Sequence, residues 1–215
     1  MDWTRTIDGY CERTDPSYWS EPINAVTNLA FILVAVFMWR RTAGYGEARF
    51  LSAVLFVIGV GSYLFHTHAT AWSAVLDVLP IILFSLTYIF LANRDYWKWP
   101  IWLAFLGTIA YFPYSAAVAW AASHLPFFNI SAEYWALPLM IGAYGFALRG
   151  RLPETANGLT IGAGILSVSL TARSLDELLC SSIPSGTHFL WHILNAIMLG
   201  WMIEVWWRHT QRSDL

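Results

Sequence analysis

Seven long apolar stretches divide the sequence, and they limit the folds open to this chain more than any other feature. They lie at about 23–39, 50–66, 73–92, 99–120, 132–148, 157–174 and 188–207. A helix needs about 20 predominantly apolar residues to cross a bilayer, and each stretch is near that length. In lipid the backbone must satisfy its own hydrogen bonds, which a helix does within one segment. We therefore predict an all-α polytopic membrane protein, with residues 1–215 forming one domain, a bundle of seven transmembrane helices.

The composition agrees with a membrane protein. Hydrophobic residues make up 57% of the chain and charged residues 12%, whereas soluble domains average roughly 45–50% and about 25%. The formal net charge is -2, and the sequence has no basic patch that would bind nucleic acid. The expected surroundings are a lipid bilayer, and the pattern indicates no particular oligomeric state.

Basic residues predict the orientation of the bundle. The loops after the first, third and fifth stretches and the C-terminal tail carry nine of them, and the opposite side carries three. The nine are Arg40, Arg41, Arg49, Arg94, Lys98, Arg149, Arg151, Arg208 and Arg212, and the three are Arg5, Arg13 and Arg173. Cytoplasmic loops are enriched in lysine and arginine, so we predict an outer N-terminus and a cytoplasmic C-terminus.

Histidines end one apolar stretch and begin another. His66 closes the second stretch, while His188 and His192 are four residues apart and therefore share one face of a helix. The predicted orientation brings all three to the outer half of the bundle. Histidine inside a membrane helix is costly and usually functional, and three protein ligands plus water form the usual catalytic zinc site. We predict zinc at these histidines; the alternatives are structural or interfacial imidazoles, or His68 in place of His66.

Two further polar residues lie near the predicted site. Asp77 follows Leu76 in an apolar setting, where an unpaired carboxylate is expensive. It could orient a water molecule or a ligand imidazole and accept a proton, or it could be a charge at a helix N-terminus. Ser62, four residues before His66, could stabilise an oxyanion or bond only to its own helix. We predict that both lie beside the histidines at about one turn's depth.

The two cysteines and the acidic N-terminal segment also belong to the outer side. Cys11 and Cys180 are either two separate buried thiols or a disulfide bond, which persists in an oxidising compartment. The first 22 residues are rich in the oxygen ligands that calcium prefers, but their spacing matches no EF-hand loop. Composition alone favours a solvated acidic flank.

The ordered motifs are similar to those of one family. They are Gly61-Ser62-x-x-Phe65-His66, Asp77 eleven residues after His66, and His188-x-x-Trp191-His192. Further matches are Cys11-Glu12, Glu21-x-x-Asn24-x-x-x-Asn28 and Asp176-x-x-x-Cys180. This set, which spans nearly the whole chain, resembles the alkaline ceramidase family, part of a wider group of seven-helix membrane hydrolases that includes the adiponectin and progestin receptors.

The resemblance implies a zinc-dependent amidase that cleaves ceramide, an N-acyl sphingoid lipid, into sphingoid base and free fatty acid within the bilayer. His66, His188 and His192 carry over as zinc ligands, with Asp77 and Ser62 as the catalytic pair. The resemblance also implies a Cys11–Cys180 disulfide and a calcium ion that braces the N-terminal segment. The implied calcium ligands are Asp8, Tyr10, Glu12, Thr14 and Glu21.

Other functions stay open at this point. A hydrolase of another N-acyl or ester lipid would use the same residues. A seven-helix lipid receptor with a structural zinc would close the metal site with a fourth protein ligand. A retinal photoreceptor is disfavoured, because its Schiff base needs a lysine within a helix and the only lysine, Lys98, lies at the predicted cytoplasmic edge.

Overall fold

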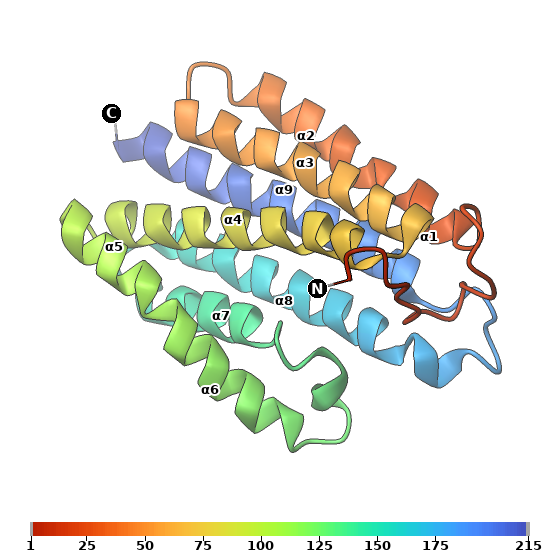
Figure 1. Ribbon diagram of the computed structural model, residues 1–215. Helices are drawn as coiled ribbons and strands as arrows, with labels where there is room; N and C mark the ends of the chain where they lie inside the picture. Colours follow the sequence, from red (N-terminus) through yellow and green to blue (C-terminus); the bar gives the residue numbers. More distant parts are fainter. Residues whose placement is uncertain (1, 214–215) are drawn as a thin grey trace.

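A computed structural model describes residues 2–213, and within them the chain is helical with no strand (Figure 1). The α-helices are α1 (Pro22–Thr27), α2 (Leu29–Arg41), α3 (Gly46–His68), α4 (Ala71–Asp95), α5 (Ile101–Ile109), α6 (Tyr111–Ser123), α7 (Ala136–Leu148), α8 (Pro153–Leu175) and α9 (His188–Ser213). Two short 3-10 helices, η1 (Phe128–Ser131) and η2 (Glu177–Leu179), lie in the connections. The all-α prediction is confirmed for this part of the chain.

Six helical segments within residues 2–213 are long and apolar enough to cross a membrane. They are Pro22–Arg41, Gly46–His68, Ala71–Asp95, Ile101–Ser123, Pro153–Leu175 and His188–Arg212. These helices indicate an integral membrane protein. They correspond to all the predicted apolar stretches except the fifth.

The fifth predicted span, 132–148, is shorter in the structure. Its helix α7 has 13 residues, so it is about 20 Å long at 1.5 Å per residue, less than a hydrocarbon core of about 30 Å. Pro138 explains the late start, because proline has no N–H for an intrahelical bond and is tolerated only in the first turn. The residues before Ala136 form turns instead.

Proline also interrupts the fourth predicted span. Its two halves, α5 and α6, meet at Ala110. Pro113 lies three residues further on and cannot donate to the carbonyl of Ile109, which removes one bond of the helical ladder. In α4 the corresponding effect at Pro80 leaves the carbonyl of Leu76 without its helical donor while the helix continues.

Helix α9 occupies the centre of the bundle and contacts α1, α2, α3 and α8. Its apolar face belongs to the main core, where Ile203 and Trp206 are almost fully buried. Figure 1 shows α4 and α8 running alongside these helices, with α5, α6 and α7 on one flank. The central position of α9 lets side chains at its N-terminus meet residues from several other helices.

The N-terminal segment, residues 2–21, lies across the end of the bundle where α1, α3, α4 and α9 meet, away from the C-terminus (Figure 1). A short backbone pairing holds it there. An isolated antiparallel bridge joins Thr6 to Thr70, and the backbone N–H of Ile7 donates to the carbonyl of Ala69 at 2.7 Å. The segment is thereby tied to the turn between α3 and α4.

A disulfide bond makes a further attachment. It joins Cys11 of the N-terminal segment to Cys180, which follows η2, with the two Cα atoms 5.3 Å apart. The two residues are 169 positions apart in sequence. The bond therefore links the start of the chain to the connection that leads into α9.

Reduction of this bond should lower the melting temperature of the detergent-solubilised protein by ~5 °C or more, because cross-links that close long loops stabilise by ~2–5 kcal/mol. Differential scanning fluorimetry with and without a membrane-permeant reductant measures the change. The Cys11→Ser/Cys180→Ser variant should melt at the lower temperature under both conditions. An unchanged melting temperature after thiol labelling has shown both cysteines reduced would contradict the expected role.

Candidate metal centre

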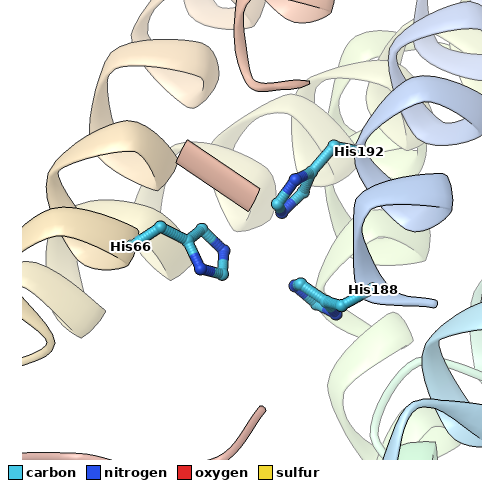
Figure 2. A group of neighbouring side chains, drawn as sticks. All are labelled: His66, His188 and His192. Carbon is cyan, nitrogen blue, oxygen red and sulfur yellow. The ribbon is translucent and has the colours of Figure 1, made fainter. Parts of the chain in front are cut away.

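Three histidines from two helices converge at the end of the bundle that the N-terminal segment covers. His66 comes from the last turn of α3, and His188 and His192 come from the first two turns of α9 (Figure 2). Each residue is at most 2% exposed. The ring centroids are 5.1 Å apart for His66 and His188 and 4.7 Å apart for the other two pairs.

These three residues form the one group of three or more His, Cys, Asp or Glu side chains within residues 2–213 that could hold a metal ion. One potential ligand atom from each histidine lies within 4.8 Å of those of the other two. The predicted alternative ligand, His68, is exposed and its ring contacts Tyr18 and Trp72. The structure therefore brings together His66, His188 and His192 and leaves His68 outside the group.

The Nδ1 atom of His66 is held by a carboxylate. It lies 2.6 Å from Oε2 of Glu21, which is 2% exposed. An ionised carboxylate only accepts hydrogen bonds, so Nδ1 of His66 carries the proton and Nε2 has a free lone pair. That Nε2 atom is buried and has no hydrogen-bond partner. An imidazole with one nitrogen fixed by a carboxylate and the other unpaired has the form of a metal ligand.

The Nδ1 atom of His192 is held by a hydroxyl. It lies 2.9 Å from Oγ1 of Thr27. The single hydroxyl proton of Thr27 is directed to the carbonyls of Ile23, at 2.8 Å, and Asn24, at 3.1 Å. Thr27 must therefore accept from Nδ1–H of His192, which leaves Nε2 of that ring as the ligand nitrogen.

His188 is held by ring stacking instead. The Tyr10 ring lies 3.8 Å from the His188 ring, centroid to centroid, at an interplanar angle of 28°. Burial raises the pKa of the Tyr10 phenol, so the stacked ring stays neutral. The Nδ1 atom of His188 is buried without a hydrogen-bond partner. Residues 10–27 thus contact all three histidines, and the Tyr10 ring also lies 5.2 Å from the His66 ring, centroid to centroid.

Asp176 fixes where α9 begins. Its carboxylate accepts three backbone N–H groups, from Cys11 at 3.0 Å, Thr187 at 2.7 Å and His188 at 2.8 Å. Gly186, at φ +63°, permits this approach, because a Cβ atom there would overlap the Asp176 carboxylate. The same side chain therefore positions the first turn of α9 and the N-terminal segment over it.

Asp77 and Ser62 face each other across the α3–α4 contact. Asp77 lies in the second turn of α4, is partly buried and interacts with Ser62 and with the charge of His66. Ser62 is 4% exposed and precedes His66 by one turn of α3. Gly61 permits the close approach, because a Cβ atom there would overlap the carbonyl of Leu76. The structure places this pair beside His66, and α4 begins at Ala71, two residues before the predicted start of that stretch.

The carboxylates predicted to hold calcium are not found together as a group of metal-ligand atoms within residues 2–213. Asp8 and Thr14 are exposed, and the Tyr10 ring is stacked on His188. Glu12 accepts the backbone N–H groups of Ile23 and Asn24 at 2.7 and 2.8 Å. Burial raises the pKa of this Glu12 carboxyl.

Glu21, the fifth predicted calcium ligand, already has protein partners for its negative charge. Its Oε1 atom accepts Nε–H of Arg13 at 2.5 Å, and its Oε2 atom accepts from His66. Burial of Glu21 acts to raise its pKa, but hydrogen bonds from His66 and Arg13 outweigh it and lower the pKa below the usual value. With both oxygens engaged by protein groups, these residues do not fit a calcium ion.

Three residues that position the site escaped the sequence interpretation. The sequence indicates Arg13 only as a basic residue of the outer side and Asp176 only as part of a motif. It gives Thr27 no role. Glu21 was identified, but with a different role. The available signal for Thr27 was its place in the polar set Asn24, Thr27 and Asn28, since residues three and four apart share one face of a helix.

The histidine donor set fits a transition metal. Zinc binds imidazole nitrogen in tetrahedral sites, whereas calcium and magnesium prefer oxygen. Nε2 of His66 is buried and unpaired, which is costly unless something binds to it. His66, His188 and His192 are thus the residues that could hold zinc.

Loss of the Thr27 hydroxyl should weaken metal binding without removing a ligand. Thr27→Val keeps the shape of the side chain but leaves Nδ1 of His192 unheld, and outer partners of this kind are worth about 10–100-fold in metal affinity. Competition between the purified protein and a chromophoric chelator for Zn²⁺ gives the affinity. Thr27→Ser, which keeps the hydroxyl, should match the wild type, and equal affinities for the valine and serine variants would rule out this role.

Comparison with known proteins extends what the geometry indicates. A search of curated proteins finds no match to this sequence. A family model described as ceramidase matches residues 4–214, nearly the whole chain. The match covers the three histidines, Asp77 and Ser62, and it agrees with the resemblance in the motifs. The chain therefore belongs to the ceramidase family, whose members are hydrolases acting on a lipid substrate.

Proposed function

We propose that this protein is an intramembrane zinc-dependent amidase that cleaves ceramide to a sphingoid base and a free fatty acid. The observation that carries the proposal is the convergence of His66, His188 and His192 in a chain of the ceramidase family. Three imidazoles whose outer sides are held leave room for one further ligand, as in catalytic zinc sites. The proposed enzyme is one seven-helix domain.

The mechanism assigns roles to residues already described. Zinc, if bound by the three histidines, would supply a Lewis acid and would lower the pKa of water to about 7. Asp77 accepts a proton from the attacking water at its carboxylate and returns it to the nitrogen of the leaving amine. Before reaction the single hydroxyl proton of Ser62 is donated to the Asp77 carboxylate. Once Asp77 holds the proton from water it can donate to the Ser62 oxygen, and the Ser62 hydroxyl is then free to donate to the amide oxygen as negative charge develops there.

An apolar cavity supports a lipid substrate. It lies between α4, α7, α8 and α9, with Phe84, Tyr88, Leu166, Trp191, Met198 and Met202 among its lining residues. Trp191 precedes His192 on α9, so the cavity begins beside the metal centre. An apolar lining of this kind suits a hydrocarbon chain, and we assign this cavity to a lipid chain of the substrate.

We also propose that the active site faces the outer side of the membrane. The basic residues of the sequence concentrate at the other end of the bundle, where Glu204 pairs with Arg41 and Arg208, both at 2.6 Å. The Cys11–Cys180 disulfide supports the same orientation, because such bonds persist in oxidising compartments. Substrate would then reach the site from the outer leaflet.

The alternative is a lipid receptor with a structural zinc. Such a site is closed by a fourth protein ligand. Within residues 2–213 no cysteine, aspartate, glutamate or further histidine joins the three-histidine group. This open position favours the hydrolase. A hydrolase of another N-acyl or ester lipid is the second alternative, and the assay below distinguishes it from a hydrolase of ceramide.

The decisive assay is release of fatty acid from ceramide by the purified protein in detergent. We expect release that stops after treatment with a zinc chelator and returns with added Zn²⁺. His192→Ala should lose both release and zinc binding, because it removes a ligand. His124→Ala, which alters an exposed histidine at the end of α6, should behave as the wild type.

Two results would contradict the proposal in different ways. Stoichiometric zinc with no release from ceramide, but release from another N-acyl or ester lipid, would change the substrate and keep the hydrolase. Stoichiometric zinc without hydrolysis of any of these lipids would favour the receptor.

Asp77→Asn should separate proton transfer from metal binding. The asparagine keeps the size of the side chain and a contact to Ser62 but cannot accept the proton, so kcat should fall about 10²–10⁴-fold. Zinc content should not change, because Asp77 is outside the ligand group. Glu177→Gln, which changes an exposed carboxylate in η2, serves as the control. Normal turnover in Asp77→Asn would exclude Asp77 as the proton acceptor.

A further inference from the structure

The guanidinium of Arg13 lies in a site built from oxygen atoms. Arg13 is 6% exposed. Its Nε atom donates to Oε1 of Glu21 at 2.5 Å, and Nη2 donates to the carbonyl of His66 at 3.0 Å. Nη1 donates to the carbonyls of Asp15 and Ser17 at 3.2 and 3.4 Å. One carboxylate and three carbonyl oxygens therefore surround a single buried cation.

These are the donor types that hard metal cations prefer. Here the four oxygen atoms accept hydrogen bonds from a side chain of the protein itself, the guanidinium of Arg13. The carbonyls of Asp15 and Ser17 belong to the loop before α1, and the carbonyl of His66 belongs to the last turn of α3. Arg13 thus braces the loop against α3, as a bound ion would.

The same guanidinium acts on the metal centre through Glu21. The two oxygens of Glu21 divide between Arg13 and Nδ1 of His66. Arg13 fixes one edge of the carboxylate, so the other edge faces His66 in one orientation. Without Arg13, a negative charge would stay buried with only an imidazole and the Asn24 amide, at 3.2 Å, as partners.

We propose that Arg13 is a positioning residue for the metal centre: its guanidinium takes the place of a calcium ion in the N-terminal segment and orients His66 through Glu21. The inference rests on the proposed zinc site and goes beyond the proposed reaction. It accounts for the poor fit of calcium to Asp8, Glu12 and Glu21. Zinc binding is therefore independent of calcium.

The test measures zinc affinity rather than hydrolysis, by chelator competition with the purified full-length protein. Arg13→Gln should weaken zinc binding about 10–100-fold, the range for partners of metal ligands. Arg13→Lys, which keeps the charge but lacks the fork of donors, should lose less. Arg5→Gln, which changes an exposed arginine of the same segment, should bind zinc as the wild type does.

A second pair of variants tests whether Arg13 acts through Glu21. Glu21→Gln keeps an oxygen that accepts from His66 but has no charge for Arg13 to fix. Adding Arg13→Gln to this variant should change zinc affinity little, because the route through the carboxylate is already gone. An equal loss in both backgrounds would show a bracing role only and overturn the inference. This pair also applies if Arg13→Gln alone fails to fold, since the double variant buries no unpaired carboxylate.

Calcium provides the remaining test. A calcium-selective chelator should leave the zinc affinity and melting temperature of the wild type unchanged. A loss of either, restored by added Ca²⁺, would overturn the inference. Wild-type protein that binds zinc but hydrolyses no ceramide would refute the proposed function and leave this inference standing, whereas wild-type protein that binds no zinc would refute both.

Discussion

A buried imidazole offers a nitrogen in a fixed direction only when its other nitrogen or its ring face is held, and this constraint organises the outer end of the bundle. Glu21 holds His66, Thr27 holds His192, and Tyr10 stacks on His188. All three contacts come from residues 10–27, although the histidines come from α3 and α9. The N-terminal segment and α1 are therefore part of the metal centre, and the helix bundle alone would not define its geometry.

The position of residues 10–27 depends in turn on the connection into α9. Asp176 binds the backbone of Cys11 and the first N–H groups around His188, and the disulfide joins the same two regions covalently. A carboxylate at this point also offsets the unpaired donors at the start of a helix. Because the Asp176 side chain binds both the N-terminal segment and the first turn of α9, it fixes the position of Tyr10 relative to His188.

The sequence predicts what depends on spacing and hydropathy. The helical class and the three histidines follow from long apolar stretches and from the four-residue interval between His188 and His192, which any helix converts into a shared face. It does not predict contacts made by irregular backbone. Glu21 has the chemistry that calcium prefers, but in the structure its two oxygens accept from Arg13 and His66 instead. The short α7 depends on a single proline, Pro138, within an otherwise apolar stretch.

The groups that hold the histidines and the groups that would react come from different segments of the chain. Ser62 and Asp77 belong to α3 and α4, where Gly61 allows the backbones to approach and the carbonyl of Leu76 is released from the helix by Pro80. Their arrangement therefore depends on local helix packing rather than on the N-terminal segment. In the proposed mechanism, metal binding and proton transfer therefore depend on different segments of the chain. His66 links them, because its Nδ1 atom is held by Glu21 and its charge acts on Asp77.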